Sequence, residues 1–339
     1  MKGILRALAS VATMAGAISI MQGASAQETV DIREWKVPYE ASRPRDPFAE
    51  SETSVWFVGQ RSGYLAHLNV ETGEIMKVDL KEGSGPHNLI VGSDGAVWYA
   101  GNRTTLIGRF DPVTNVIEEI PMPDPAARDP HTLIFDEGEK NIWFSVQGGN
   151  MMGRLNLETR KVDLIPSQTE RSRPYGIKMA PDGSIWVSLF GVNKLAHINP
   201  ETLELKEIVL PREETRPRRL EITSDGRIWY VDYAKGMLGV YDPSSKEFEE
   251  WQMPQGEGAR PYGVAKDGQD RVWMVATGVQ PNIFLGFDPA TEEFFSATEV
   301  PSGGGTIRHM HYHAPSGAIW FGADTNYVGR AIVEPQAGE

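Results

Sequence analysis

The stretch Gly85-Pro86-His87-Asn88-Leu89 recurs in related forms along the whole chain, and its spacing decides the fold. Trp98 follows His87 by eleven residues, inside the turn-and-strand segment Asp94-Gly95-Ala96-Val97-Trp98. Six further copies of this pair of features carry the tryptophans Trp56, Trp143, Trp186, Trp229, Trp273 and Trp320. A period of about 43 residues with several short strands per unit is typical of a β-propeller blade. The sequence therefore predicts an all-β protein, a seven-bladed β-propeller whose blades are four-stranded antiparallel sheets.

The two ends of the repeat array are complementary. Residues 31–38 resemble an outer strand but come before any inner strand. Tyr327-Val328-Gly329-Arg330 resembles the third strand Leu106-Ile107-Gly108-Arg109, and no outer-strand segment follows it. We therefore expect residues 31–38 to complete the last blade, because this closes the ring and leaves no long free sheet edge.

Residues 1–26 differ in composition from the rest. Lys2 and Arg6 precede an apolar run from Ala7 to Met21, and Ala24-Ser25-Ala26 has the small-x-small pattern of a cleavage site. These features are typical of a secretory signal peptide, and the apolar run is too short for a membrane anchor. We expect an exported protein, periplasmic or secreted, in which residues 27–339 form a single propeller domain.

The overall composition narrows the class of partner. The 339 residues have a net charge of −13, contain no cysteine and include no lysine- or arginine-rich run. Nucleic acid and anionic membranes are therefore not expected partners. Without disulfides, stability depends on the core and on closure of the ring. We expect a monomer that does not span a membrane and binds a small molecule.

The residues that begin the predicted inner strands form a ring of polar side chains. Counting eleven residues back from each tryptophan, or twelve in the third copy, gives Arg45, His87, His131, Tyr175, Arg218, Tyr262 and His309. In a propeller these positions converge on one face around the central channel, where ligands usually bind. Imidazoles transfer protons and guanidiniums bind anions, so the ring predicts a catalytic or ligand-binding site.

A second ring of residues lies two positions earlier in the chain. It consists of Arg43, Gly85, Asp129, Arg173, Arg216, Arg260 and Ile307. Arginine fills four of these seven places in an acidic protein, which favours a cationic mouth and a ligand with carboxylate, phosphate or lactone oxygens. The alternative is that these arginines form ion pairs between blades.

Two further patterns could hold a metal ion. His309, His311 and His313 alternate, so on a strand they point to one side, which allows a zinc or copper site. The alternative is that they are buried and hydrogen-bonded, since the matching places in other blades are apolar, such as Leu89 and Val91. Asp129 and His131, with His87 in the preceding repeat, could surround one metal ion or one water molecule.

The Pro-His and Pro-Tyr segments, the Asp-Gly-x-Ile/Val-Trp turns and the Ile-Gly-Arg third strand resemble the streptogramin B lyase (virginiamycin B lyase) family over residues 31–333. The resemblance implies a seven-bladed propeller that opens the ester ring of a cyclic depsipeptide antibiotic by elimination with a magnesium ion. It also implies a role in antibiotic resistance.

The same resemblance implies roles for individual residues. His131 would take the proton α to the ester carbonyl, His87 would assist at the leaving oxygen, and Tyr175 would line the pocket. The family places two glutamates near the site, and this chain has Asp129 in place of the first and Val146 or Gln147 in place of the second. Mg²⁺ prefers charged oxygen ligands, so we expect it to be held weakly, by Asp129 with Gln147 as a poor second ligand.

The leading interpretation is a streptogramin lyase-like exported propeller that opens an ester or lactone of a small molecule by magnesium-assisted elimination. The predicted substrate-binding residues are Tyr175, Arg45, Arg173, Arg218, Tyr262 and His309. One alternative is a non-catalytic propeller that binds an anionic ligand or a protein partner. The other is a metal-dependent lactone hydrolase.

Overall fold

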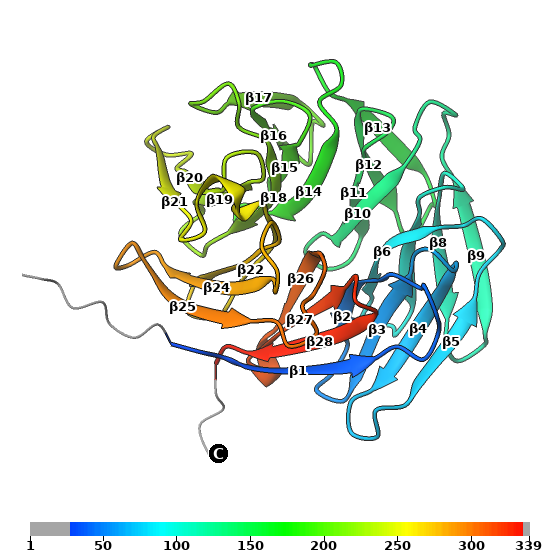
Figure 1. Ribbon diagram of the computed structural model, residues 1–339. Coiled ribbons are helices and arrows are strands. Elements are labelled where there is room, and N and C mark those ends of the chain that lie inside the picture. The colour runs from blue at the N-terminus through cyan, green and yellow to red at the C-terminus, as the bar shows by residue number, and fades with distance from the viewer. Residues whose placement is uncertain (1–27, 335–339) are drawn as a thin grey trace, which may run out of the picture.

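Seven four-stranded antiparallel sheets surround a central axis in the computed structural model, which describes residues 28–334 (Figure 1). The predicted all-β, seven-bladed propeller is confirmed. The predicted signal peptide, residues 1–26, lies outside the described residues. Between residues 28 and 334, no helix has the length and apolar character of a membrane-spanning segment.

Each blade has an inner, a second, a third and an outer strand. The inner strands are β2 (Pro44–Ala49), β6 (Pro86–Val91), β10 (Pro130–Phe135), β14 (Pro174–Met179), β18 (Pro217–Ile222), β22 (Pro261–Lys266) and β26 (Ile307–His313). The second strands are β3 (Ser54–Gly59), β7 (Val97–Gly101), β11 (Asn141–Val146), β15 (Ile185–Leu189), β19 (Ile228–Asp232), β23 (Val272–Ala276) and β27 (Ala318–Ala323). The third strands are β4 (Tyr64–Asn69), β8 (Leu106–Asp111), β12 (Met151–Asn156), β16 (Lys194–Ile198), β20 (Met237–Tyr241), β24 (Ile283–Asp288) and β28 (Tyr327–Ile332). The outer strands are β5 (Ile75–Asp79), β9 (Val116–Pro121), β13 (Val162–Pro166), β17 (Leu205–Val209), β21 (Phe248–Gln252), β25 (Glu293–Glu299) and β1 (Asp31–Lys36). Two short 3₁₀ helices are present: η1 (Gly256–Ala259) lies in the connection between the fifth and sixth blades, and η2 (Ala314–Ser316) lies between β26 and β27 of the seventh.

The seventh blade takes its outer strand from the N-terminal part of the chain. β1 pairs antiparallel with β28, from Asp31 opposite Ile332 to Lys36 opposite Tyr327, and Figure 1 shows the blue and red strands side by side. Trp35 stacks on Trp320 with 5.4 Å between ring centroids. The sheet and the stacked rings therefore join residues from both ends of the chain.

The core lies between neighbouring sheets, where the second and third strands meet the next blade. One apolar cluster joins Trp143 of the third blade to Ile177 and Val187 of the fourth. The glycine of the repeated third-strand motif is needed for this packing. Gly108 pairs with Tyr99, and a Cβ atom at Gly108 would overlap the Tyr99 ring. The third strand therefore has no side chain at the glycine, and a large ring from the second strand fills that space.

Every inner strand has an irregular register close to its start. In β10 the pairing with β11 is interrupted between Pro130 and Leu133, and five other inner strands are interrupted directly after their first residue. In β2 the interruption comes one residue later, between Arg45 and Phe48. A bulge breaks the alternation of side chains between the two faces of a strand. As a result, the side chains of the consecutive residues His131 and Thr132 both lie on the channel side of the strand. The His131 ring packs on Tyr175, and Thr132 lines the axial cavity below.

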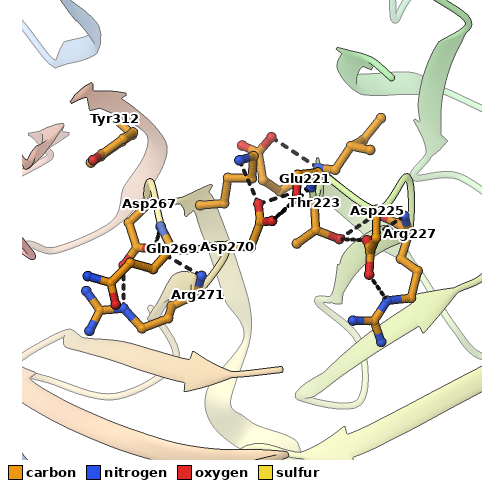
Figure 2. A network of polar contacts seen from close by, with 12 residues as sticks. Glu221, Thr223, Asp225, Arg227, Asp267, Gln269, Asp270, Arg271 and Tyr312 are labelled. Carbon is orange, nitrogen blue, oxygen red and sulfur yellow. Dashed lines mark hydrogen bonds and ion pairs between the residues drawn. The ribbon is translucent and has the colours of Figure 1, made fainter. Parts of the chain in front are cut away.

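The far ends of the inner strands are tied together by polar turns. Figure 2 shows this network for the fifth and sixth blades. Ser224 donates its backbone N–H to the Asp270 carboxylate of the next blade over 3.1 Å. Asp267 accepts from Arg271 Nε over 2.6 Å and from Trp273 Nε1 over 2.8 Å. These contacts fix the propeller at the end opposite the ring residues.

Candidate active site

Two histidines and a tyrosine from three successive blades lie in contact at the start of the inner strands, with their rings tilted by 39° and 52°. The ring centroids of His87 and His131 are 3.5 Å apart, and those of His131 and Tyr175 are 4.0 Å apart. His87 is 4% exposed and His131 is 1% exposed. The structure therefore brings together the three residues that the sequence selected, but inside the channel and not at an open mouth.

The hydrogen bond of His87 fixes its tautomer. His87 Nδ1 lies 3.2 Å from the backbone carbonyl oxygen of His131. A carbonyl oxygen only accepts, so Nδ1 carries the hydrogen and Nε2 carries a lone pair. His131 Nδ1 lies 2.9 Å from the Thr132 hydroxyl, which can donate or accept.

Burial keeps both imidazoles neutral. Desolvation lowers the pKa of His131 well below its usual value, and Arg219 and Arg45 lower it further. The pKa of His87 is lowered in the same way, first by burial and then by Arg45 and His131. A neutral imidazole has a lone pair that can accept a proton, but the lowered pKa also makes each histidine a weaker base than a free imidazole.

Tyr175 and Tyr262 share a hydrogen bond between their hydroxyl groups. Burial raises the pKa of Tyr175, but Arg218, Arg45 and Arg219 together outweigh it and bring the pKa to about 8. Burial raises the pKa of Tyr262 to about 12. One phenol of the pair can therefore lose its proton near neutral pH while the other keeps it.

Arg218 lies in a cage of four aromatic rings. Its guanidinium carbon is 3.6 Å from the ring centroid of Tyr262, 4.3 Å from Tyr233, 4.4 Å from Phe190 and 5.2 Å from Tyr175. These cation–π contacts hold the positive charge over the tyrosine pair.

A second layer of charged and polar side chains lies one residue further along the inner strands. Asp46 accepts from Asn88 Nδ2 over 3.0 Å, and its carboxylate lies 3.4 Å from Arg219 and 3.4 Å from Arg45. The sequence analysis did not select Asp46, Asn88 or Arg219. Each of them directly follows a ring residue, but the bulge that turns it toward the channel has no marker in the sequence.

The position of His309 differs from the prediction. Trp320 pairs with His311, nine residues earlier, whereas Trp98 pairs with Ile90, eight residues earlier. The turn that contains η2 has one extra residue, so counting eleven residues back from Trp320 was wrong for this blade. Ile307 occupies the place of the repeated proline, Arg308 belongs to the ring, and His309 lies in the second layer.

The three alternating histidines do not meet at one point. His309 and His311 line an axial cavity of about 190 Å³ below the ring, where His311 stacks on Phe48 at 4.2 Å. His313 Nδ1 instead lies 2.8 Å from the Ser316 hydroxyl. Across residues 28–334, no three His, Cys, Asp or Glu side chains are grouped so that they could hold a metal ion.

Asp129 and Gln147, which the sequence analysis named as weak metal ligands, lie side by side at the rim of the channel. Asn102 Nδ2 donates to Asp129 Oδ1. The Gln147 amide satisfies both neighbours when its nitrogen faces Asp129 Oδ2 at 3.1 Å and its oxygen faces Arg173 Nη2 at 3.0 Å. Both Asp129 and Arg173 have a left-handed backbone, with φ of 66° and 52°.

This rim does not fit a magnesium ion. Its one carboxylate already accepts two amide hydrogens, and a guanidinium stands beside it. Burial raises the pKa of Asp129 to about 6, which shows how poorly its negative charge is stabilised. A hard dication needs several charged or carbonyl oxygens directed at it. Magnesium binding by Asp129 and Gln147 stays an untested prediction.

The predicted substrate-binding arginines lie in different environments. Arg45 is buried and bonds Gln60 Oε1 over 3.1 Å, whereas Arg173 is exposed at the rim. Arg43 follows the ion-pair alternative, since its Nε lies 3.5 Å from Asp324 of the last blade. The mouth is therefore a mixture of blade-joining arginines and arginines available to a ligand.

The family model described as "Virginiamycin B lyase family" matches residues 12–280 and 160–337. The chain belongs to the virginiamycin B lyase family. The two matches overlap, as expected when similar blades can align in more than one register. No curated protein sequence matches the chain.

Solved structures of virginiamycin B lyases have the same fold. A virginiamycin B lyase from Staphylococcus aureus superposes with a TM-score of 0.80 at 20% identity, covering 90% of this chain and 100% of that one. A streptogramin B lyase structure gives a TM-score of 0.77 at 20% identity, covering 89% and 97%. A hydrazine synthase from Kuenenia stuttgartiensis gives 0.72 at 12% identity, covering 86% and 96%. At these identities the structures establish the propeller and not the reaction.

Proposed function

We propose that this member of the virginiamycin B lyase family is an exported carbon–oxygen lyase that opens an ester or lactone of an anionic small molecule by β-elimination. The observation that carries the proposal is the contact of the neutral His87–His131 pair with Tyr175, 4.0 Å from His131, beneath the Arg218 guanidinium. This combination offers a base beside groups that stabilise negative charge.

The proposed β-elimination needs no reagent besides the substrate and the protein. His131 takes the proton from the carbon α to a carbonyl, and the electron pair of that C–H bond forms a C=C bond. The C–O bond at the β carbon breaks, and its electron pair leaves on the oxygen of a carboxylate. The proton on His131 then passes to solvent.

Other residues stabilise the developing charge. His87 presents only a lone pair at Nε2, so we assign the leaving oxygen to guanidinium groups and not to His87. Within residues 28–334, Arg45 Nη2 and Arg218 Nε make no hydrogen bond, although both atoms are buried. Unpaired buried donors of this kind are costly unless a ligand oxygen accepts from them.

The test is a product analysis of the purified protein with a streptogramin B, in the presence of magnesium and in the presence of a chelator. Elimination gives a linear product of unchanged mass with a new C=C bond. Hydrolysis adds one water and would favour the lactone hydrolase. Unchanged substrate across streptogramins and simple acyloxy carboxylates would contradict the proposal.

A second candidate function is ligand binding without catalysis. The observation in its favour is that the two histidines are almost fully buried, with 4% of His87 and 1% of His131 exposed. A ligand held by the rim arginines alone would not reach His131. Saturable binding of an intact ester that is unaffected by His131→Ala would support this candidate.

A further inference from the structure

The rim above His131 resembles a metal site in position but differs from one in its chemistry. Both carboxylate oxygens of Asp129 accept hydrogen bonds from side-chain amides, Oδ1 from Asn102 and Oδ2 from Gln147. Each oxygen keeps one further lone pair, but a metal ion that used it would compete with the amide donors for the charge of the carboxylate. It would then gain a single carboxylate, because Gln147 is neutral.

The charges around the rim also disfavour the binding of a divalent cation. Asp129 feels two guanidiniums, Arg173 and Arg45, and both lower the pKa of its carboxyl group against the larger effect of burial. Two fixed positive charges beside one carboxylate leave no net negative charge to attract a cation. Repulsion between like charges is strong where solvent is partly excluded.

Arg173 differs from Arg43 and Arg308 in the charge of its hydrogen-bond partner. Arg43 and Arg308 both pair with the Asp324 carboxylate, which neutralises part of their charge. Arg173 bonds the neutral oxygen of Gln147, and its guanidinium lies 5.4 Å from the Phe190 ring centroid. Among the described residues no carboxylate forms an ion pair with Arg173, and its side chain is exposed, so its charge is accessible to a ligand.

We infer that Arg173, held by Gln147 and Asp129, supplies at this rim the fixed positive charge that a divalent cation supplies in a metal-dependent site, and that the rim binds a carboxylate or phosphate oxyanion without a metal. The inference builds on the proposed active site. Its test measures binding alone, so its failure can be told apart from failure of the elimination reaction.

The first arm of the test is calorimetric titration of the metal-free protein with MgCl₂. We expect no saturable binding to the wild type. The double variant Gln147→Glu/Arg173→Met should gain a magnesium site, because it adds a carboxylate and removes the neighbouring cation. Adding Asp129→Asn to that double variant should abolish the gained site. Saturable magnesium binding to the wild type that is lost in Asp129→Asn alone would overturn the inference.

The second arm is titration with inorganic phosphate as the oxyanion. Arg173→Met should weaken phosphate binding about tenfold, the usual effect of losing one charge-assisted contact. The matched control is Arg33→Met, because Arg33 is also an exposed arginine but lies on the outer strand β1 and not in the ring at the mouth. Equal weakening by the two variants, or none by Arg173→Met, would overturn the inference. Circular dichroism melting of each variant checks that the fold is retained.

Discussion

The hydroxyl groups of Tyr175 and Tyr262 bond to each other across the propeller axis, although their blades, the fourth and the sixth, are not neighbours. The contact closes the channel between the outer mouth and the axial cavity. With Arg218 over both rings, it makes the pair a proton-holding group at the centre of the molecule.

The tyrosine pair should be visible as a phenol that titrates near neutral pH. Tyr175 is expected to ionise with a pKa of about 8, since Arg218, Arg45 and Arg219 favour its phenolate. The absorbance difference near the tyrosinate band should rise through pH 8 in the wild type and not in Tyr175→Phe. Tyr64→Phe is the control, because burial raises the pKa of Tyr64 to about 12.

Ionisation of Tyr175 should also affect stability. The folded-state pKa of Tyr175 lies below its unfolded value, so the unfolded chain binds more protons between about pH 8 and 10. The free energy of unfolding of the wild type, relative to Tyr175→Phe, should therefore rise with pH across this window. A flat difference in urea unfolding would contradict the shifted pKa.

Removing the proposed base should abolish elimination while the fold persists. His131→Asn keeps a polar group of similar size but cannot accept a proton, and loss of a general base typically lowers the rate by about 10²–10⁴-fold. Rates of C=C formation measured by absorbance would show this. His197→Asn, at a half-buried histidine beside Trp186 on the fourth blade, should leave the rate unchanged.

Ionisation of Asp129 at the rim should make stability depend on pH in the direction opposite to that expected for Tyr175. Its folded-state pKa is raised to about 6 by burial, so the folded protein binds the proton more tightly than the unfolded chain. The stability contribution of Asp129 is fully present below its unfolded pKa and is lost as the pH rises through 6. Relative to Asp129→Asn, the wild type should lose on the order of 1 kcal/mol between pH 4 and pH 7, because solvent screens this partly exposed group.

Closure of the ring depends on the Trp35–Trp320 stack. Trp35 is buried and lies 5.4 Å from Trp320, so Trp35→Ala should destabilise the protein by about 3–5 kcal/mol. Thermal melting would measure the effect. Val113→Ala is the control: Val113 is 93% exposed, and its removal should change stability by less than about 0.5 kcal/mol.

The sequence predicted the blades well because their signals are local. Each blade carries local features that determine how it packs, and these features recur with the repeat period. They are a tryptophan, an Asp-Gly turn and a third-strand glycine such as Gly108. The first ring layer was predicted for the same reason, since the proline marks where each inner strand begins. The count failed in the seventh blade, where η2 adds one residue before Trp320.

The second layer could not be predicted from the pattern. Asp46, Asn88 and Arg219 directly follow ring residues, and a regular strand would point them away from the channel. The bulge brings them inward, and no residue type in the sequence marks it. The contacts between Asp46 and Arg219 join the first and fifth blades, a distance around the ring that spacing alone does not encode.

The pairing of β1 with β28 sets the order in which the protein can be completed during synthesis. Asp31 is made early, yet its partner Ile332 emerges only after six blades have left the ribosome. Until then the first strand has no sheet to join, and the entropy of closing so long a loop must be overcome in the last step.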